Sequence, residues 1–159
     1  MSAGYNEPTV CNDLNKLAPQ FRASVEAALL ECQNAGLDAI VFETYRSNAL
    51  AKLYYARGRT IIPPHQTVTN APDNSYSWHG FSLAADFISK SKEWGASLEW
   101  FTEVANIFKK HNCKWGGNWT TKDLPHAQWF RCKPSPSNAA RLVLREQGME
   151  AVWKIVGAD

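Results

Sequence analysis

The chain has 159 residues, 45% of them hydrophobic and 20% charged, with a formal net charge of +2. This length and composition fit one globular domain with a buried core. The balanced charge argues against nucleic acid as a partner, because nucleic-acid-binding domains concentrate basic residues, and the lack of a long apolar run argues against membrane insertion.

The first half of the chain predicts two helical segments and a strand. A short helical turn is expected at residues 13–17, followed by a helix in which Pro19 is the first residue. Its inward positions recur at helical spacing, and Gly36 ends the run; they are Phe21, Val25, Leu29 and Cys32. A continuous apolar run at residues 39–42 then has the length of a strand.

Ser47 can cap a second long helix that extends to about Arg57. A loop at residues 59–76, rich in Pro, Thr and Asn, follows it. Loops of this length in a compact domain are usually functional or disordered. Because this loop leads directly to His79, we expect it to be functional.

The second half of the chain predicts two more strands and three more helical segments. Strands are expected at residues 83–88 and 127–130, with a tight turn at residues 115–119. A helix at residues 97–110 would carry five apolar side chains inward; they are Leu98, Phe101, Val104, Ala105 and Phe108. Helices capped by Ser137 and starting near Met149 end the chain. No repeat or linker is visible, so residues 1–159 are expected to form a single α+β domain.

The tryptophans and the cysteines can each have a structural or a functional role. The chain has seven tryptophans, which either enlarge the core or provide stacking surfaces for sugar-like ligands. Its four cysteines form no close pair of the kind that holds a cysteine zinc knuckle. With no signal peptide visible, free thiols in a reducing compartment are expected. We expect Cys113 and Cys132 to be small buried residues.

His79 and Asp86 are the first candidate metal ligands. In an extended strand Ala84, Asp86 and Ile88 share one face, and an acid among apolar residues is costly unless its charge is paired. A metal ion is one possible partner. The spacing alone is weak evidence for a metal site.

His126 is the best third ligand, because Asp123 precedes it by three residues and Pro125 prevents a regular helix between them. Both side chains can then face one cleft, with Asp123 as a base that takes a proton from activated water. Zinc catalysis needs three protein ligands and one open position. The alternative is that Asp123 and His126 are solvated loop residues.

Arg46 and Ser77 are candidate substrate-binding residues. Arg46 stands where the first strand ends, and a guanidinium there can bind a carboxylate or stabilise an oxyanion; alternatively it is a surface charge. Ser77 can hydrogen-bond substrate or a ligand. The remaining histidines, His65 and His111, are interpreted as structural or solvated.

These motifs resemble the zinc D-Ala-D-Ala carboxypeptidase and L-alanyl-D-glutamate endopeptidase superfamily, peptidase family M15 (VanY-like), and particularly its small phage endolysins. Its Ser-x-His-x6-Asp signature is matched by Ser77 to Asp86, and its later acid-before-His motif by Asp123 to His126. A Tyr-Arg-Ser segment is matched at residues 45–47, a Leu-Tyr-Ala-x-Gly-Arg-Thr segment approximately at residues 54–60, and a Trp-Gly-Gly-x-Trp segment at residues 115–119.

The resemblance implies a small antiparallel sheet flanked by helices, of the Hedgehog/DD-peptidase type. It also implies one Zn²⁺ bound by His79, Asp86 and His126, with Asp123 as catalytic base and Arg46 in contact with substrate or transition state. Three positions depart from the family pattern: Ser82 replaces a common Gly, Ala51 a common Gln, and Ala127 a common aromatic residue. None removes a ligand or the base.

The function expected from this resemblance is a zinc peptidase that cuts the stem peptide of peptidoglycan between L-Ala and D-Glu. A D-Ala-D-Ala carboxypeptidase of the same family is the close alternative, and a zinc-stabilised module that binds wall peptides without cutting them is the non-enzymatic one. As a phage lysin it would be made in the host cytoplasm without a signal peptide, would act as a monomer, and would reach the wall after the membrane is permeabilised. No separate wall-binding domain is expected.

Overall fold

The computed structural model describes residues 7–57, 59, 69 and 71–159. Most of the predicted loop at residues 59–76 lies outside the described residues, and so does His65. The same holds for residues 1–6, on which the expectation about a signal peptide depends. The predictions for these segments therefore stay predictions.

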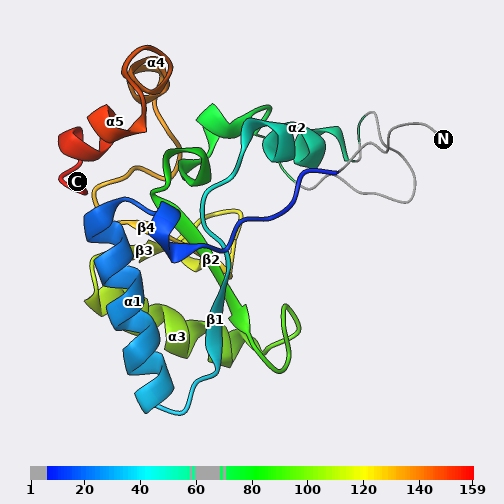
Figure 1. Cartoon of the computed structure of the whole chain (residues 1–159). Helices are drawn as coiled ribbons and strands as arrows, with labels where there is room; N and C mark the ends of the chain where they lie inside the picture. Colours follow the sequence, from blue (N-terminus) through cyan, green and yellow to red (C-terminus); the bar gives the residue numbers. More distant parts are fainter. Residues whose placement is uncertain (1–6, 58, 60–68, 70) are drawn as a thin grey trace.

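An antiparallel sheet of four strands forms the centre of the described part of the chain, in the order β1-β2-β4-β3 (Figure 1). The strands are β1 (Ala39–Glu43), β2 (Ala84–Ser89), β3 (Cys113–Trp115) and β4 (His126–Trp129). Three of them match the predicted strands within one or two residues. The sequence analysis did not predict β3, which is only three residues long and pairs with β4.

Two helices, α1 (Pro19–Asn34) and α3 (Leu98–Lys110), cover one face of this sheet (Figure 1). The ring of Phe87 on β2 stacks on that of Phe108 on α3, with centroids 5.0 Å apart. Trp129 on β4 meets Phe21 on α1 edge to face at 6.4 Å. The core therefore lies between the two helices and this face, which we call the covered face.

The inward positions of α3 are as predicted with one exception. Phe101, Val104, Ala105 and Phe108 are buried, whereas Leu98 is 57% exposed, so its predicted inward position is wrong. Leu98 directly follows the N-cap residue Ser97. The buried stripe starts one turn later at Phe101, so the first turn of the helix extends past the surface that packs against it.

The remaining helices lie towards the upper part of Figure 1 and include α2 (Asn48–Ala56), α4 (Asn138–Gln147) and α5 (Met149–Ile155). Ser47 and Ser137 cap α2 and α4 as predicted, each accepting a backbone N–H at 3.1 Å. The described residues form five α-helices and one antiparallel sheet, which confirms the α+β prediction. Among the described residues no helix is both long and apolar enough to span a bilayer.

Short 3₁₀ helices complete the fold: η1 (Leu14–Lys16), η2 (Asn74–Tyr76), η3 (Trp78–Phe81) and η4 (Gly116–Asn118). The first agrees with the predicted turn at residues 13–17. The segment of η2 and η3 lies directly before β2 and carries Ser77 and His79. The Cβ that Gly80 lacks would lie 1.9 Å from the carbonyl oxygen of Asn74, so only glycine allows η3 to pack against η2.

Candidate metal centre

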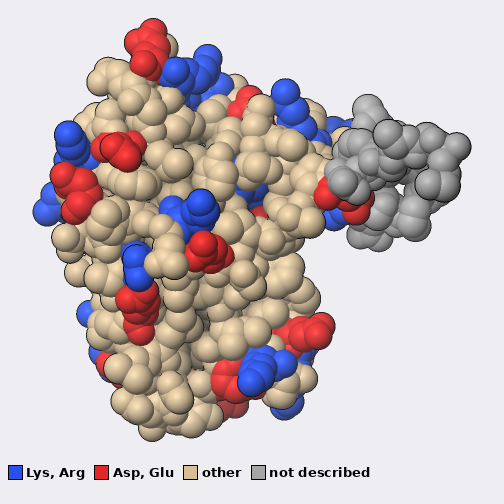
Figure 2. Space-filling model, in the orientation of Figure 1, with Lys and Arg blue, Asp and Glu red and all other residues tan. Residues whose placement is uncertain are grey.

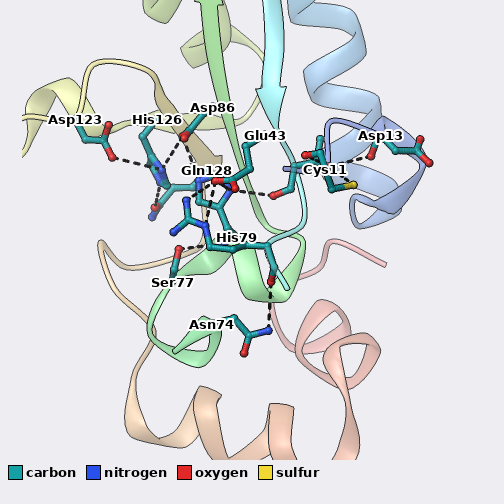
Figure 3. A network of polar contacts seen from close by, with 12 residues as sticks. Cys11, Asp13, Glu43, Asn74, Ser77, His79, Asp86, Asp123, His126 and Gln128 are labelled. Carbon is teal, nitrogen blue, oxygen red and sulfur yellow. Dashed lines mark hydrogen bonds and ion pairs between the residues drawn. The ribbon is translucent and has the colours of Figure 1, made fainter. Parts of the chain in front are cut away.

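The polar site lies on the other face of the sheet, which we call the open face. Asp86 on β2 stands directly opposite His126 on β4 and opposite Glu43 on β1. Directly opposed residues on neighbouring strands point to the same side of a sheet. The three side chains therefore form a row across three strands (Figure 3).

A β-bulge places Glu43 in this row. The register between β1 and β2 shifts between Val41 and Glu43, so that Phe42 is an extra residue. Strict alternation from Val41 would turn Glu43 towards the covered face. The extra residue re-aims the strand, and Glu43 becomes the neighbour of Asp86.

The structure brings together the three predicted ligands, His79, Asp86 and His126. Their potential ligand atoms all lie within 4.8 Å of one another. Oδ1 of Asp86 is 3.1 Å from Nε2 of His79 and 3.5 Å from Nδ1 of His126. Two imidazoles and one carboxylate in this arrangement are a common donor set for a catalytic zinc ion, which keeps a fourth position open.

Hydrogen bonds outside the cluster fix which ring nitrogen each histidine turns inward. Nδ1 of His79 lies 2.9 Å from the carbonyl oxygen of Thr44 and must donate its proton there, which leaves the Nε2 lone pair free. Nε2 of His126 lies 2.8 Å from Oε1 of Gln128. The Gln128 amide donates to the carbonyl of Lys133 at 2.8 Å, so its oxygen is the acceptor for His126. Both inward nitrogens can therefore bind a metal.

The charges of the cluster also suit a cation. Burial raises the pKa of Asp86, but the charges and hydrogen bonds of His79 and His126 outweigh burial and hold that pKa well below its usual range. Burial lowers the pKa of His126, yet its hydrogen bond to Asp86 and the charges of Asp86 and Asp123 raise it overall. A proton and a metal ion thus compete for the same negative pocket.

Asp123 lies at the edge of the cluster rather than inside it. Its Oδ2 is 3.9 Å from Nδ1 of His126, and its side chain is 47% exposed. Burial and the charge of Asp86 raise its pKa. Gly116 accepts the backbone N–H of Asp123 at 2.9 Å, and a Cβ on Gly116 would lie 2.6 Å from the Asp123 carbonyl oxygen. The bend that Pro125 predicts is therefore stabilised by a close backbone contact that only a glycine at position 116 allows.

Arg46 is not a surface charge. Its side chain is 12% exposed, and its Nε and Nη2 both donate to Oε1 of Glu43, the former at 3.1 Å. Its backbone N–H donates to the carbonyl of His79 at 3.0 Å. The other Glu43 oxygen is buried and has no hydrogen-bond partner among the described residues. Glu43 thus holds the guanidinium beside the row of metal-binding candidates.

A cleft of about 640 Å³ joins these residues. Every predicted site residue lines it, together with Trp119, whose ring centroid is 4.9 Å from that of His126. The hydroxyl of Ser77 accepts the backbone N–H of His79 at 3.3 Å, so Ser77 supports a ligand segment while lining the cleft. His111 lies outside the cleft, where its ring is 3.1 Å from a carboxylate oxygen of Glu31.

Sequence reasoning missed two residues that hold the site, Glu43 and Gln128. Both are polar side chains in apolar strands, with 1% exposure each. The argument that singled out Asp86 applies to them as well, because a buried polar group needs a partner. Gln128 is two positions after His126, and this spacing predicts a shared strand face.

The structure also tests the prediction that two cysteines are buried, and it shows the conformation of Ser82. Cys113 and Cys132 are buried as predicted, and all four cysteines are free. Ser82 has a φ of 57° and is fully buried. Because this left-handed conformation favours glycine, it explains why a glycine is common at this position in the family that the sequence resembles.

Comparison with known proteins agrees with this geometry. A family model described as D-alanyl-D-alanine carboxypeptidase matches residues 70–129, a segment that contains His79, Asp86, Asp123 and His126. The peptidoglycan L-alanyl-D-glutamate endopeptidase CwlK of Bacillus subtilis (strain 168) is 30% identical over 133 residues, which are 75% of each chain.

Two solved structures share the fold. The L-Ala D-Glu endopeptidase ChiX of Serratia marcescens superposes with a TM-score of 0.52 at 22% identity, covering 73% of this chain and 82% of its own. The LD-carboxypeptidase LdcB, whose structure concerns peptidoglycan recognition, gives 0.51 at 14% identity, covering 94% and 76%. At these identities the two structures support the architecture.

Proposed function

The chain belongs to the M15-type family of D-alanyl-D-alanine carboxypeptidases and L-alanyl-D-glutamate endopeptidases, which are peptidoglycan peptidases, and we propose that it is a zinc-dependent endopeptidase that cuts the stem peptide between L-Ala and D-Glu. One observation carries the proposal. The cluster of His79, Asp86 and His126 has both imidazoles fixed in the tautomer that a metal requires, and it lines a cleft that also contains Asp123.

When bound by these three residues, a zinc ion supplies a Lewis acid that activates water and polarises the scissile carbonyl. Asp123 would accept the proton of the attacking water and pass it to the leaving amine. Its partly exposed position leaves room for that water, and its raised pKa brings it closer to the value that suits a general base near neutral pH.

Arg46 would stabilise the oxyanion that forms at the scissile carbonyl or bind a substrate carboxylate. Its planar guanidinium is held by Glu43 and lines the cleft. An arginine fixed in this way needs no reorganisation when negative charge develops. Ser77 would bind substrate less directly, since its hydroxyl already accepts a backbone N–H of His79.

A second candidate, a carboxypeptidase that removes terminal D-Ala, is favoured by the description of the matching family model. In that reaction Arg46 would bind the free carboxylate of the substrate. The two reactions leave different new termini on the peptide. Mass spectrometry of digested peptidoglycan therefore distinguishes them directly.

The catalytic proposal is tested by adding zinc-loaded wild type or zinc-loaded Asp123→Ala protein to purified peptidoglycan. We expect the rate of turbidity loss to fall by about 10²- to 10⁴-fold, the usual contribution of a general base, while zinc content is unchanged. Asp159→Asn, which removes an exposed carboxylate at the C-terminus, is the matched control and should keep wild-type activity. Equal turbidity loss from wild type and Asp123→Ala would favour the non-catalytic binding module.

The resemblance to small phage endolysins supports a narrower proposal, that the protein lyses a bacterial host once its membrane has been permeabilised. Purified protein added to chloroform-treated cells should then clear the suspension, whereas intact cells with an outer membrane should resist it. Clearing of both at the same rate would contradict the need for a separate membrane-opening step.

A further inference from the structure

An aromatic pair starts directly next to Glu43, which belongs to the row of side chains at the candidate metal centre. Phe42, the extra residue of the β1 bulge, directly precedes Glu43. Its ring meets that of Trp94 edge to face, with centroids 4.7 Å apart. Ile40 and Ile88 oppose each other on the same face, because both alternate with residues that point to the helices. Ile88 is two residues from Asp86, or about 7 Å along the strand.

Trp94 is unusual among the tryptophans of this chain. All seven lie within the described residues, and six of them are buried or half-buried, whereas Trp94 is 48% exposed. Five of these six belong to the core or pack against it, as expected if tryptophans enlarge the core, and the sixth, Trp119, lines the cleft. Trp94 exposes a flat apolar surface to water, and the contact with Phe42 restricts the orientation of its ring.

The loop that carries Trp94 is held rigidly. The backbone N–H groups of Glu93 and Gly95 donate within the loop, to the carbonyls of Ser89 at 2.7 Å and Lys92 at 2.9 Å. Asp38 accepts hydrogen bonds from the Ser89 hydroxyl at 2.9 Å and the Ser91 backbone at 2.9 Å. A binding surface on such a loop loses little conformational entropy when a ligand arrives.

The surface above this loop is mainly uncharged, whereas the loop itself carries Lys90, Lys92 and Glu93. The loop follows β2 at the lower right of Figure 1, and Figure 2 shows the molecule hollowed just above it. The visible wall of this hollow is formed mainly by uncharged residues. A pyranose ring fits such a place, since its apolar face can lie on an aromatic ring while its hydroxyl groups remain in water.

We propose that Phe42 and Trp94, which we call the aromatic platform, bind the amino sugar to which the stem peptide is attached. This inference rests on the proposed function. In peptidoglycan a lactyl group joins L-Ala to the sugar, so the sugar starts about 7 Å from the L-Ala carbonyl when these two units are extended. Phe42 directly precedes Glu43, which stands opposite Asp86, so the platform starts next to the candidate metal centre.

The test compares two substrates that differ only in the sugar, a disaccharide-bearing stem peptide and the same peptide with an N-terminal lactyl group alone, so that the L-Ala nitrogen is an uncharged amide in both. For Trp94→Ala we expect kcat/KM on the sugar-bearing substrate to fall about tenfold, mainly through KM, and to change less than about twofold on the lactyl peptide. Leu30→Ala removes a comparably exposed apolar side chain from α1, at 59% exposure, and should change neither value. Thermal unfolding of each variant checks that the fold is retained.

Calorimetric titration of both ligands into zinc-loaded Asp123→Asn protein, with and without Trp94→Ala, gives a readout that does not require cleavage. Tighter binding of the sugar-bearing ligand, lost in Trp94→Ala, supports the platform. Equal affinity for the two ligands, or an equal loss for both in Trp94→Ala, overturns it. Failure of the wild type to cut either substrate counts against the proposed function alone, because the titration still decides the platform.

Discussion

The two faces of the sheet are built by alternate residues of the same strands but are stabilised in different ways. On the covered face Ala85, Phe87 and Ala127 pack against α1 and α3 without polar side-chain partners, and Trp129 adds one hydrogen bond, from its indole N–H to the carbonyl of Val156 at 2.7 Å. On the open face Glu43, Asp86, His126 and Gln128 are polar, and each needs a matched hydrogen bond or charge. The first face is stabilised by apolar area removed from water, and the second by electrostatic pairing.

This difference suggests that the covered face determines the stability of the fold, whereas the open face carries the residues proposed for catalysis. The covered face can tolerate exchange of one apolar side chain for another of similar volume. The open face concentrates negative charge that the protein alone pairs incompletely, because the buried oxygen of Glu43 has no partner among the described residues. We therefore expect stability to depend on the metal through the open face alone.

The largest effect on stability is expected on the covered face. Phe87 is 1% exposed and contacts the rings of Phe101 and Phe108. Phe87→Ala should lower the free energy of unfolding by about 3 to 5 kcal/mol, through lost transfer energy and a cavity. Urea unfolding should give the same loss with zinc and with a chelator. Leu98→Ala, at an exposed position on α3, is the control and should change stability by less than about 0.5 kcal/mol.

A loss that appeared only in the presence of zinc would contradict the separation of the two faces. It would mean that packing at Phe87 acts by positioning Asp86, its neighbour on β2. The loss is then measured at two zinc concentrations to quantify that coupling.

A somewhat smaller effect, confined to the metal-bound protein, is expected for His126→Ala. The wild type should gain about 2.7 kcal/mol of stability when free zinc exceeds its dissociation constant 100-fold. The variant should lose both this gain and its bound zinc, as measured by thermal unfolding and elemental analysis. His111→Ala, which changes a histidine outside the cleft, should keep both. Full zinc occupancy in His126→Ala would show that another residue is the third ligand.

The sequence predicts the covered face well and also singles out the three side chains that the structure brings together at the candidate metal centre, because both depend on local patterns. The helical spacing of Phe21 and Val25 and the apolar run of β1 specify their elements directly. His79, Asp86 and His126 are recognisable because acids and imidazoles at these positions need partners. Arg46 was recognisable from its place at the end of a strand.

The parts that sequence could not predict depend on register. Simple alternation places Glu43 on the same face as Val41, and only the bulge at Phe42 turns it to the candidate metal centre. Gln128 orients His126 only because the segment at Cys132 and Lys133 returns to accept its amide protons. The sequence thus indicates that Glu43 and Gln128 need partners, but the partners themselves depend on the register of the strands and on the turn after β4.

A third and smaller effect, on activity, is expected when the ion pair between Glu43 and Arg46 is altered. Glu43→Gln keeps the shape but removes the charge, and should lower kcat about tenfold with little change in KM. Arg46→Lys should fold normally and lose most activity, because a point charge cannot replace a planar guanidinium. If Glu43 acts through Arg46, the double variant should be little worse than Arg46→Lys.

Additive losses in that double variant would instead give Glu43 a separate role. The control is Glu26→Gln, which removes the exposed ion pair with Arg22 on α1. Exposed pairs of this kind contribute less than about 1 kcal/mol, and this one lies far from the cleft, so kcat and KM should both be unchanged.

The smallest effect is expected at Asp38, which braces the loop that carries Trp94 at the end of the sheet. Hydrogen bonds from the Ser91 hydroxyl and backbone, with a further one from Ser89, lower the pKa of Asp38 from 3.8 to about 2. Because the folded-state pKa lies below the unfolded value, this stabilisation is complete above about pH 4 to 5 and is lost as the pH falls through 2. Asp38→Asn should therefore lower stability at pH 7 by less than about 1 kcal/mol, since water screens this partly exposed group. Urea unfolding at pH 7, 4 and 2.5 should show the difference from wild type shrinking with pH, and a difference that grew towards low pH would contradict the assignment.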